Sequence, residues 1–513
     1  MIAKGYMGRI LMVDLTERKI TVRDMEDGDA RQFIGGSGYG AKLLFDAKAV
    51  DCDPLGPDNV LIFAVGPLTA TSLFNSDRFD VITKSPLTGI FAESSSGGFW
   101  AGKFKKCGYD ALVIKGRSSS PVYLSITDEK TEIKDAKAYW GMDTFAATEA
   151  LQKAEGAGVK AAVIGPAGEN LVKIAGIVSD GKHGRLAGRC GVGAVMGSKM
   201  LKAITAGGTR KVEVADRESI TAINKSLSEP MKVNTQGMAD GGTGGGLEAS
   251  EELGNLPVKN WSGVPWHDGA KKITGLTMAK THLVKTYNCG SCVIKCGRVV
   301  KSQTGPYAGE EIGGPEYETL GLLGSNLLID DLGAVITSNE LCNRYGLDTI
   351  STGGVIGFAM EAFEKGLLTV KDTGGLELSW GNAEAVHRLI EDIALQRGLG
   401  KLLGGGVRAA AEELGPPAEE FAAHIKGLEP PAHDGRAKFT AAVGMATSNR
   451  GACHLSGFSH DFEEGAVLED LGSPALPRRF TPEGKPENVF RMQNLMGMMD
   501  SAIVCKFALF GGL

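Results

Sequence analysis

The chain has 513 residues, which is too many for one hydrophobic core, so two or three domains are expected. Hydrophobic residues make up 42 % and charged residues 23 %, as in ordinary soluble globular proteins. The net charge of -6 provides no basic field and argues against a nucleic-acid partner.

No segment reaches the roughly 20 apolar residues that span a bilayer, and polar residues interrupt the N-terminus too early for a secretory signal. We therefore predict a cytoplasmic protein without membrane insertion. The number of cysteines is odd and their density is low, which favours a reduced compartment and metal-binding thiols over disulfides. The nine cysteines are Cys52, Cys107, Cys190, Cys289, Cys292, Cys296, Cys342, Cys453 and Cys505.

Glycine is the unusual component: the 73 glycines are about twice the average usage of roughly 7 %. They follow no fixed period, which excludes a collagen-like chain. Two explanations stay open, namely many tight turns in a β-rich domain or backbone packed closely against a large planar cofactor.

Short β-branched runs bounded by turn residues predict a β-rich domain with few helices up to about residue 210. The expected strands lie at 9–15, 19–25, 60–66, 80–84, 111–116, 122–128 and 160–165. Glycine-rich connections at 78–102 and 180–199 offer backbone amides to phosphates or pterin rings. The run 191–197 is not a dinucleotide fingerprint, because its third glycine comes one residue late.

Beyond residue 211 the hydrophobic period becomes helical. Helices are expected within 220–233, 349–368, 383–403 and 407–415. The polar, glycine-rich segment 238–254 is predicted to be a loop, and proline-rich stretches suggest a boundary between 415 and 435.

The sharpest local motif is Cys289-Gly-Ser-Cys292-Val-Ile-Lys-Cys296. Three thiols so close together can face one metal centre, and a fourth ligand must then come from elsewhere, with Cys505 as the candidate. Zinc is the competing interpretation, although zinc sites more often use two separated pairs of ligands.

Two further residues have side chains suited to acid-base chemistry. Glu318 lies in the Gly/Pro turn GPEYET, where burial would favour the acid form of a carboxylate. His454 follows Ser-Asn-Arg-Gly-Ala-Cys in a glycine-containing segment. Each is weak evidence alone, because acidic turns and single histidines are common.

Six motifs occur along the chain in an order that resembles the tungsten aldehyde:ferredoxin oxidoreductase family. They are IGPAGENLVK, RCGVGAVMGSKxLKAI, CxxCxxxCGRV, GPEYET, LCNRYGLDTISTGG and NRGACH. The resemblance implies an α+β fold in which a double β-sheet pterin-binding domain, 1–210, precedes two mainly α-helical domains. The first of these, 211–420, carries the cysteine motif, and the second, 421–513, would be incomplete at its C-terminus.

The resemblance also implies the cofactors: a tungsten bis-molybdopterin, one 4Fe-4S cluster and a Mg²⁺ ion that bridges the pterin phosphates. Molybdenum stays an alternative to tungsten, because the same pterin sulfurs bind both. The cluster ligands would be Cys289, Cys292, Cys296 and Cys505. Mg²⁺ would be held by the backbone carbonyls of Ser95 and Leu186, although Ser95 stands where the family has asparagine.

Further positions match the family's pterin-binding residues. Arg78 would lie between cluster and pterin, and the other matches are Gly97, Arg185, Leu186, Ala187, Gly188, Asn343, Asp348 and Asp500. Both DxxGL(D/C) motifs depart from the pattern, since the first begins with Asn343 and the second reads Asp500-Ser-Ala-Ile-Val-Cys505.

Glu318 and His454 match the two side chains nearest the tungsten. The implied reaction is oxidation of an aldehyde to a carboxylic acid, in which Glu318 takes a proton and His454 hydrogen-bonds the aldehyde oxygen. Electrons would leave to ferredoxin or a dedicated iron-sulfur subunit. A homodimer and a hetero-oligomer both stay open.

Two other functions remain as alternatives. One is the tungsten subunit of a benzoyl-CoA reductase, although the presence of both Glu318 and His454 favours the aldehyde enzyme. The other is a cofactor-binding structural subunit without catalysis, which the altered pterin motifs and the short C-terminus suggest.

Overall fold

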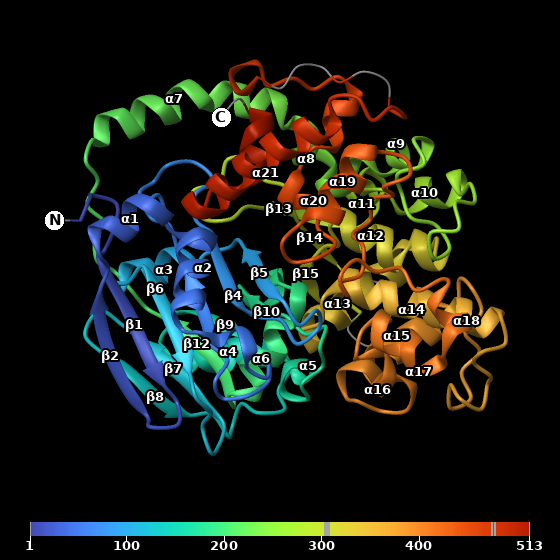
Figure 1. Ribbon diagram of the computed structural model, residues 1–513, viewed down its shortest axis with the longest axis horizontal. Coiled ribbons are helices and arrows are strands. Elements are labelled where there is room, and N and C mark those ends of the chain that lie inside the picture. Colours follow the sequence, from blue (N-terminus) through green and yellow to red (C-terminus); the bar gives the residue numbers. More distant parts are fainter. Residues whose placement is uncertain (1, 302–307, 473–475, 477–478, 512–513) are drawn as a thin grey trace.

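The computed structural model describes residues 2–301, 308–472, 476 and 479–511. Most strands lie in the N-terminal part of the chain, where they form two mixed six-stranded sheets (Figure 1). The first sheet has the spatial order β2 (Lys19–Asp24), β1 (Arg9–Asp14), β6 (Ala111–Lys115), β3 (Leu61–Ala64), β4 (Phe79–Lys84), β5 (Phe91–Ser96). The second has the order β11 (Arg185–Ala187), β10 (Ile177–Ser179), β9 (Lys160–Val163), β12 (Leu201–Ala206), β7 (Val122–Ile126), β8 (Thr131–Asp135).

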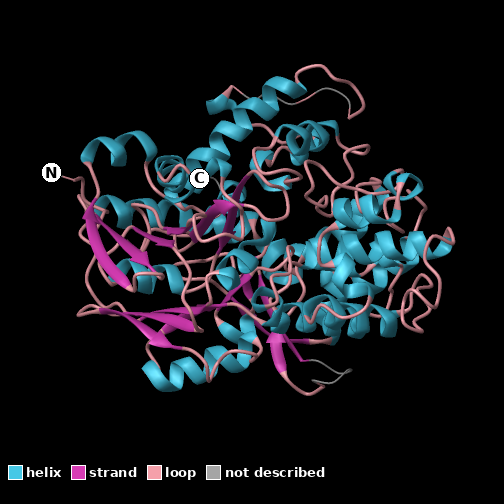
Figure 2. Cartoon of the chain, turned by 60° about the horizontal axis from the view of Figure 1, so that its bottom comes forward, coloured by secondary structure: helices cyan, strands magenta, loops and turns pink. Residues whose placement is uncertain are grey.

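One pair of neighbouring strands in each sheet is parallel: β1 with β6, and β7 with β12. The other neighbours are antiparallel. All seven strands expected from the sequence are present, and mainly helical structure follows them. Figure 2 shows most of the strands on one side of the molecule and a part built of helices and loops on the other. The predicted α+β class, with a double sheet before the helices, is therefore confirmed.

Strand β3 shows how the two sheets share one core. Side chains alternate between the faces of a strand, so Leu61 and Phe63 pack between the sheets against residues such as Ile204 of β12. Ile62 and Ala64 point the other way, onto helix α2 (Gly36–Asp46). The sheets thus form a sandwich whose outer faces carry helices.

Six helices connect the strands, which is more than the sequence pattern suggested. They are α1 (Asp27–Phe33), α2, α3 (Trp100–Lys106), α4 (Thr144–Glu155), α5 (Pro166–Glu169) and α6 (Val192–Ser198). The reason is that α2 and α6 are rich in glycine, so their intrinsic helix propensity is low. Every residue of α6 is buried, so tertiary packing stabilises a helix that local propensity does not predict.

The second half of the chain is mainly helical. Its helices are α7 (Arg217–Asn234), α8 (Gln236–Gly241), α9 (Leu247–Glu252), α10 (His267–Ile273), α11 (Gly275–Thr281), α12 (Tyr317–Leu323), α13 (Leu332–Tyr345), α14 (Thr349–Glu364), α15 (Ala383–Ala394), α16 (Leu399–Leu403), α17 (Val407–Leu414), α18 (Pro416–Glu419), α19 (Phe439–Thr447), α20 (His454–Gly457) and α21 (Lys485–Ala502). Asp331, Asp348 and Asn382 cap α13, α14 and α15 by accepting hydrogen bonds from their first turns. The four predicted helical segments all contain helices.

The loop predicted at 238–254 is wrong, because this segment contains the end of α8, a short 3₁₀ helix (Thr243–Gly246) and α9. Leu247 is fully buried in the helical core. The backbone of Gly241 lies so close to Gly275 that a Cβ at Gly275 would overlap its carbonyl oxygen. Burial and close backbone contact therefore order a segment whose composition is typical of loops.

A small antiparallel sheet, β13 (Leu283–Tyr287), β14 (Gly297–Lys301) and β15 (Glu311–Gly313), interrupts the helices. The connection between β13 and β14 contains the three-cysteine motif. The hairpin therefore holds the motif on a short, defined turn.

Glycines bring the end of α21 onto the N-terminal sandwich. A Cβ at Gly66 would lie 2.6 Å from the carbonyl oxygen of Ala502, and one at Gly36 would overlap the carbonyl oxygen of Asp500. These glycines serve close approach between backbone segments, and this contact places Asp500 and Cys505 beside the first sheet.

Among the described residues, no single helix has the length and apolar composition needed to cross a membrane. One sharply bent pair of helices, Tyr317–Leu327 with Leu332–Tyr345, passes that test by length and composition alone. Most of α13 is buried in the helical core.

Candidate active site

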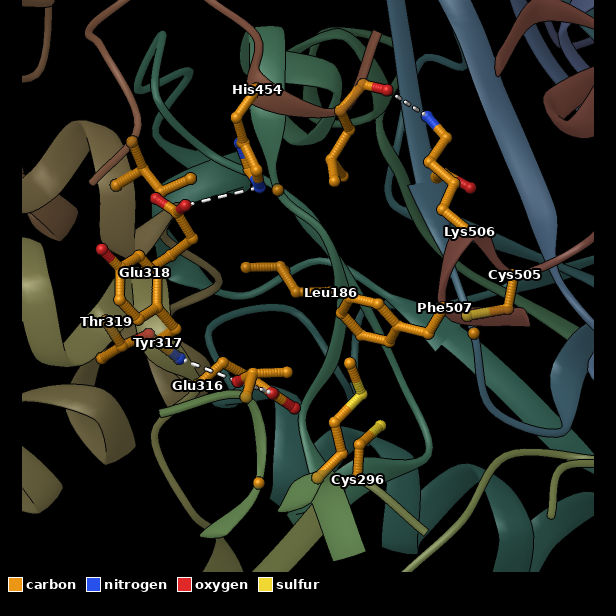
Figure 3. Close-up of a pocket in the computed structure, with 18 of the residues that line it drawn as sticks. Leu186, Cys296, Glu316, Tyr317, Glu318, Thr319, His454, Cys505, Lys506 and Phe507 are labelled. Carbon is orange, nitrogen blue, oxygen red and sulfur yellow. Dashed lines mark hydrogen bonds and ion pairs between the residues drawn. The ribbon is translucent and has the colours of Figure 1, made fainter. Parts of the chain in front are cut away.

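A cavity of about 980 Å³ lies where the sandwich, the small sheet and the helices meet. Most residues predicted from the sequence line it: Arg78, Ser95, Gly97, Arg185, Leu186, Gly188, Cys289, Cys292, Cys296, Glu318, Asn343, Asp348, His454, Asp500 and Cys505. Ala187 is the exception, because its side chain packs in the sandwich core. Figure 3 shows Glu318 and His454 on one side of the cavity and Cys505 with Phe507 on the other.

The cysteine motif and Cys505 come from distant segments that Asn75 holds together. The Asn75 amide donates to the carbonyl of Ser291 at 2.9 Å, and its own carbonyl accepts from the Cys505 amide at 2.8 Å. Gly97 provides space, since a Cβ there would lie 2.8 Å from the Cys289 sulfur. The fourth thiol predicted from the sequence therefore faces the same cavity as the other three.

A positive charge, that of Arg78, lies beside these thiols. Burial lowers the pKa of Arg78, but Cys505 and Cys289 outweigh it and the pKa stays above its ordinary value. Arg78 also donates to the Ser95 hydroxyl at 3.3 Å. Burial, followed by the nearby Cys505, raises the pKa of Cys292 to about 11. A metal centre would reverse this last effect, because thiols bind metals as thiolates.

The two strands that would supply Mg²⁺ ligands belong to different sheets. Ser95 lies on β5 and Leu186 on β11, and these edge strands contact each other across the sandwich. Arg185, also on β11, forms a 3.0 Å ion pair with Glu316. The edges of both sheets thus end at the cavity, where the family resemblance places the pterin phosphates.

The predicted pterin contacts Asp348 and Asp500 already have protein partners. Asp348 caps α14 and forms a 3.0 Å ion pair with buried Arg189. Asp500 pairs with Lys506 at 2.9 Å. Asn343 lies on α13 beside Gly184, where a Cβ would come within 2.9 Å of the Asn343 amide nitrogen.

Two acids that line the cavity were not predicted, buried Asp80 and half-buried Glu93. Burial, and then the charge of Asp500, raises the pKa of Asp80 to about 7. The same two causes, in the same order, raise the pKa of Glu93. A signal was present in the sequence, since Asp80 is a lone acid in the apolar strand FDVIT.

Six buried side-chain atoms on described residues that line the cavity have no hydrogen-bond partner. They are Asp80 Oδ2, His183 Nδ1, Arg185 Nε, Asn255 Oδ1, Glu318 Oε1 and Arg450 Nε. Buried polar atoms are normally satisfied, so these atoms indicate a polar occupant. A pterin, with ring nitrogens and phosphate oxygens, fits this donor and acceptor set, and the thiols fit an iron-sulfur cluster.

Glu318, on α12, is held through one of its two oxygens. The Ala432 amide donates to Oε2 at 2.6 Å, while Oε1 lies 3.4 Å from His454 Nε2 (Figure 3). Burial raises the pKa of Glu318 to about 7, although the Ala432 amide opposes this. A carboxylate with this pKa is suited to proton transfer near neutral pH.

His454 begins α20, and a second histidine faces the same carboxylate. Burial, and then the charge of His460, hold the pKa of His454 well below its ordinary value. His433, which was not predicted, places Nε2 3.4 Å from Glu318 Oε1. The sequence pattern of its proline-rich segment, LEPPAHDG, predicts only a domain boundary.

Comparisons with known proteins agree with these observations. The profile "Aldehyde ferredoxin oxidoreductase, N-terminal domain" matches residues 10–208, and "Aldehyde ferredoxin oxidoreductase, domains 2 & 3" matches 218–511. The tungsten-containing aldehyde ferredoxin oxidoreductase of Pyrococcus furiosus is 40 % identical over 99 % of this chain and 82 % of its own length.

Proteins named for other activities are also similar to this chain. The WOR-like subunit of the aliphatic sulfonate oxidoreductase of the same organism is 32 % identical over 88 % of this chain and 75 % of its own length. A solved structure, the active site complex BamBC of benzoyl coenzyme A reductase with 1,5-dienoyl-CoA, superposes with a TM-score of 0.84 at 26 % identity, over 99 % of this chain and 82 % of that one. The chain belongs to the aldehyde ferredoxin oxidoreductase family of tungsten-containing oxidoreductases.

Proposed function

We propose that this protein oxidises aldehydes to carboxylic acids and passes the electrons to ferredoxin or an iron-sulfur subunit. The observation that carries the proposal is the Glu318 and His454 pair in the same cavity as four convergent cysteines. The 40 % identity to a tungsten-containing aldehyde ferredoxin oxidoreductase supports it.

The residues would divide the binding of the cofactors. Cys289, Cys292, Cys296 and Cys505 would hold a 4Fe-4S cluster, with Arg78 beside two of these thiols. The strand edges β5 and β11 would face the pterin phosphates and their Mg²⁺ through Ser95 and Leu186. When bound, a tungsten bis-pterin would supply two-electron redox chemistry, and the cluster would supply a one-electron route to the carrier.

The protein's own part in the reaction is proton transfer and orientation. Oxidation of an aldehyde, with water as the source of the added oxygen, yields the acid, two protons and two electrons. Ionised Glu318 would accept a proton from water or from the hydrated aldehyde through its free oxygen, Oε1. His454, neutral because of its low pKa, would donate a hydrogen bond to the aldehyde oxygen as charge develops there.

The test is anaerobic metal analysis followed by dye assays. We expect about one tungsten and four iron per chain, and reduction of a viologen dye by aldehydes. Zinc without tungsten or iron would exclude an oxidoreductase.

A second candidate is reduction of an aromatic thioester, which the structural similarity to BamBC favours. Reduction of the oxidised dye by aldehydes, with no oxidation of the reduced dye by an aromatic thioester, supports the aldehyde reaction. Oxidation of the reduced dye by an aromatic thioester, with no reaction of aldehydes, supports the second candidate.

A further inference from the structure

Three potential metal ligands from separate segments converge at the catalytic end of the cavity. Glu318 comes from α12, His454 from the start of α20, and His433 from the segment between α18 and α19. One ligand atom from each lies within 4.8 Å of the other two. The side chains of Glu318, His433 and His454 are 16 %, 9 % and 16 % exposed, so the three atoms meet in a largely buried space.

The carboxylate atom at the centre of this group is free. The Ala432 amide occupies Oε2, which leaves Oε1 buried and without a hydrogen-bond partner. Each imidazole Nε2 lies 3.4 Å from Oε1. Hydrogen bonding within the protein therefore does not satisfy this oxygen.

The spacing suits a metal ion. With bonds of about 2.1 Å to each ligand, a separation of 3.4 Å between Oε1 and either Nε2 corresponds to an angle of about 108° at the ion, close to tetrahedral. Two imidazoles and one carboxylate suit zinc and its neighbours better than Mg²⁺ or Ca²⁺, which prefer oxygen ligands alone. All three residues line the cavity, so an ion bound to them could take water as a further ligand.

The surroundings of His433 hold its ring as a metal ligand requires. The Asn255 side-chain amide lies 3.0 Å from Nδ1, so Nε2 is the nitrogen that points to Glu318. The ring stacks between Tyr317 and His460, with centroid distances of 5.0 and 4.7 Å. The amide of Asn255 also has a buried oxygen without a partner, which can accept Nδ1–H if the amide is turned over.

We infer that Glu318, His433 and His454 form a binding site for one divalent cation of the zinc class, separate from any metal of the pterin cofactor. An ion there uses the free oxygen of Glu318 and the Nε2 lone pair of His454. It therefore blocks aldehyde oxidation. Only this blocking effect rests on the proposed function, and the binding itself does not.

The experiment is equilibrium dialysis of the anaerobic holoenzyme against zinc buffered by a chelator. After dialysis, the amounts of zinc, tungsten and iron per chain are measured. We expect the wild type to take up one zinc beyond its cofactor metals, and His433→Phe to bind it at least about tenfold more weakly. His282→Phe is the matched control, because His282 is a partly buried histidine outside the cavity and should leave zinc uptake unchanged.

Tungsten and iron contents report whether each variant is assembled. If His433→Phe loses them, Glu318→Gln, which removes the charge without a change of size, carries the same comparison. No extra zinc in the wild type, or equal zinc affinity in the assembled variant, would overturn the site. Zinc binding is measured from the metal content of the protein. The experiment therefore tests the cation site even if the enzyme does not oxidise aldehydes.

Discussion

The carbonyl of Asn75 accepts a hydrogen bond from the amide of Cys505 at 2.8 Å, although 430 positions in the sequence separate the two residues. The Asn75 amide donates to Ser291 within the cysteine motif, and its side-chain oxygen accepts from Val293 at 3.4 Å. Asn75 has a positive φ of 61°. This single residue therefore connects the two parts of the proposed cluster site.

Replacing Asn75 by Ala should loosen this connection. The left-handed backbone disfavours alanine, and the side-chain contact to Val293 is lost, so we expect a loss of roughly 1–3 kcal/mol with reduced iron content. Asn75→Gly is the control, because glycine tolerates the backbone and loses only the side chain. Thermal unfolding measures the stability of both variants, and iron analysis measures their iron content per chain. An Ala variant as stable and as rich in iron as the wild type would contradict this role.

Cys292→Ala should remove iron and the visible absorption of the cluster together, because a cluster ligand is lost. Cys342→Ala is the matched control: Cys342 is fully buried in α13, far along the chain from the motif. The control should keep its iron and lose only roughly 1–2 kcal/mol of stability from the cavity it leaves. Iron analysis and anaerobic absorption spectra distinguish the two variants. A full iron content in Cys292→Ala would exclude Cys292 as a cluster ligand.

Local sequence was enough for much of the fold. Short β-branched runs bounded by turn residues predicted β1, β2, β3, β4, β6, β7 and β9. Helical periodicity predicted α7, α14, α15 and α17. The sequence pattern missed β12, which pairs with β7 in parallel and with β9, because such pairing depends on distant segments. It also misplaced α8 and α9, where burial of Leu247 outweighs a glycine-rich composition.

The site shows the same division. Residues within recognisable motifs, such as Glu318, His454 and the cysteines, could be predicted, and most of the predicted residues line the cavity. Asn75 and His433 could not, because their roles come from tertiary contacts with Cys505 and Glu318 rather than from neighbours in the sequence.

Arg189 should be hard to replace even by lysine. Its buried guanidinium pairs with Asp348 at 3.0 Å and donates to the carbonyls of Glu429 at 2.6 Å and Ala452 at 3.2 Å. It thus joins the sandwich to the segments that precede His433 and His454. A lysine ammonium cannot reproduce the planar fork, so we expect Arg189→Lys to cost about 2–4 kcal/mol in unfolding free energy.

Arg388→Lys provides the control for Arg189, since Arg388 forms an exposed ion pair with Asp392 at 3.1 Å. Its replacement should change stability by less than about 1 kcal/mol. Denaturant unfolding of the anaerobic proteins measures both variants. Equal and small effects would show that Arg189 does not hold the segments together.

Glu318→Gln should keep tungsten and iron while aldehyde oxidation falls by about 10²- to 10⁴-fold, the range expected when a general base is lost. Gln preserves the size of the side chain and its contact with the Ala432 amide, but its uncharged oxygen cannot take up a proton. Glu311→Gln, an exposed acid on β15, is the control and should keep full activity.

The pH profile gives this assignment a second, independent test. Burial raises the pKa of Glu318 to about 7, and a base must be ionised to act, so kcat/KM of the wild type should fall as the pH drops below about 7. Above that pH the carboxylate is ionised, so kcat/KM should no longer rise with pH on account of Glu318. The residual activity of Glu318→Gln should lack this acidic limb of the profile, the fall in kcat/KM below about pH 7. A wild-type profile that is flat through this range, or a limb that persists in the variant, would assign the base to another residue.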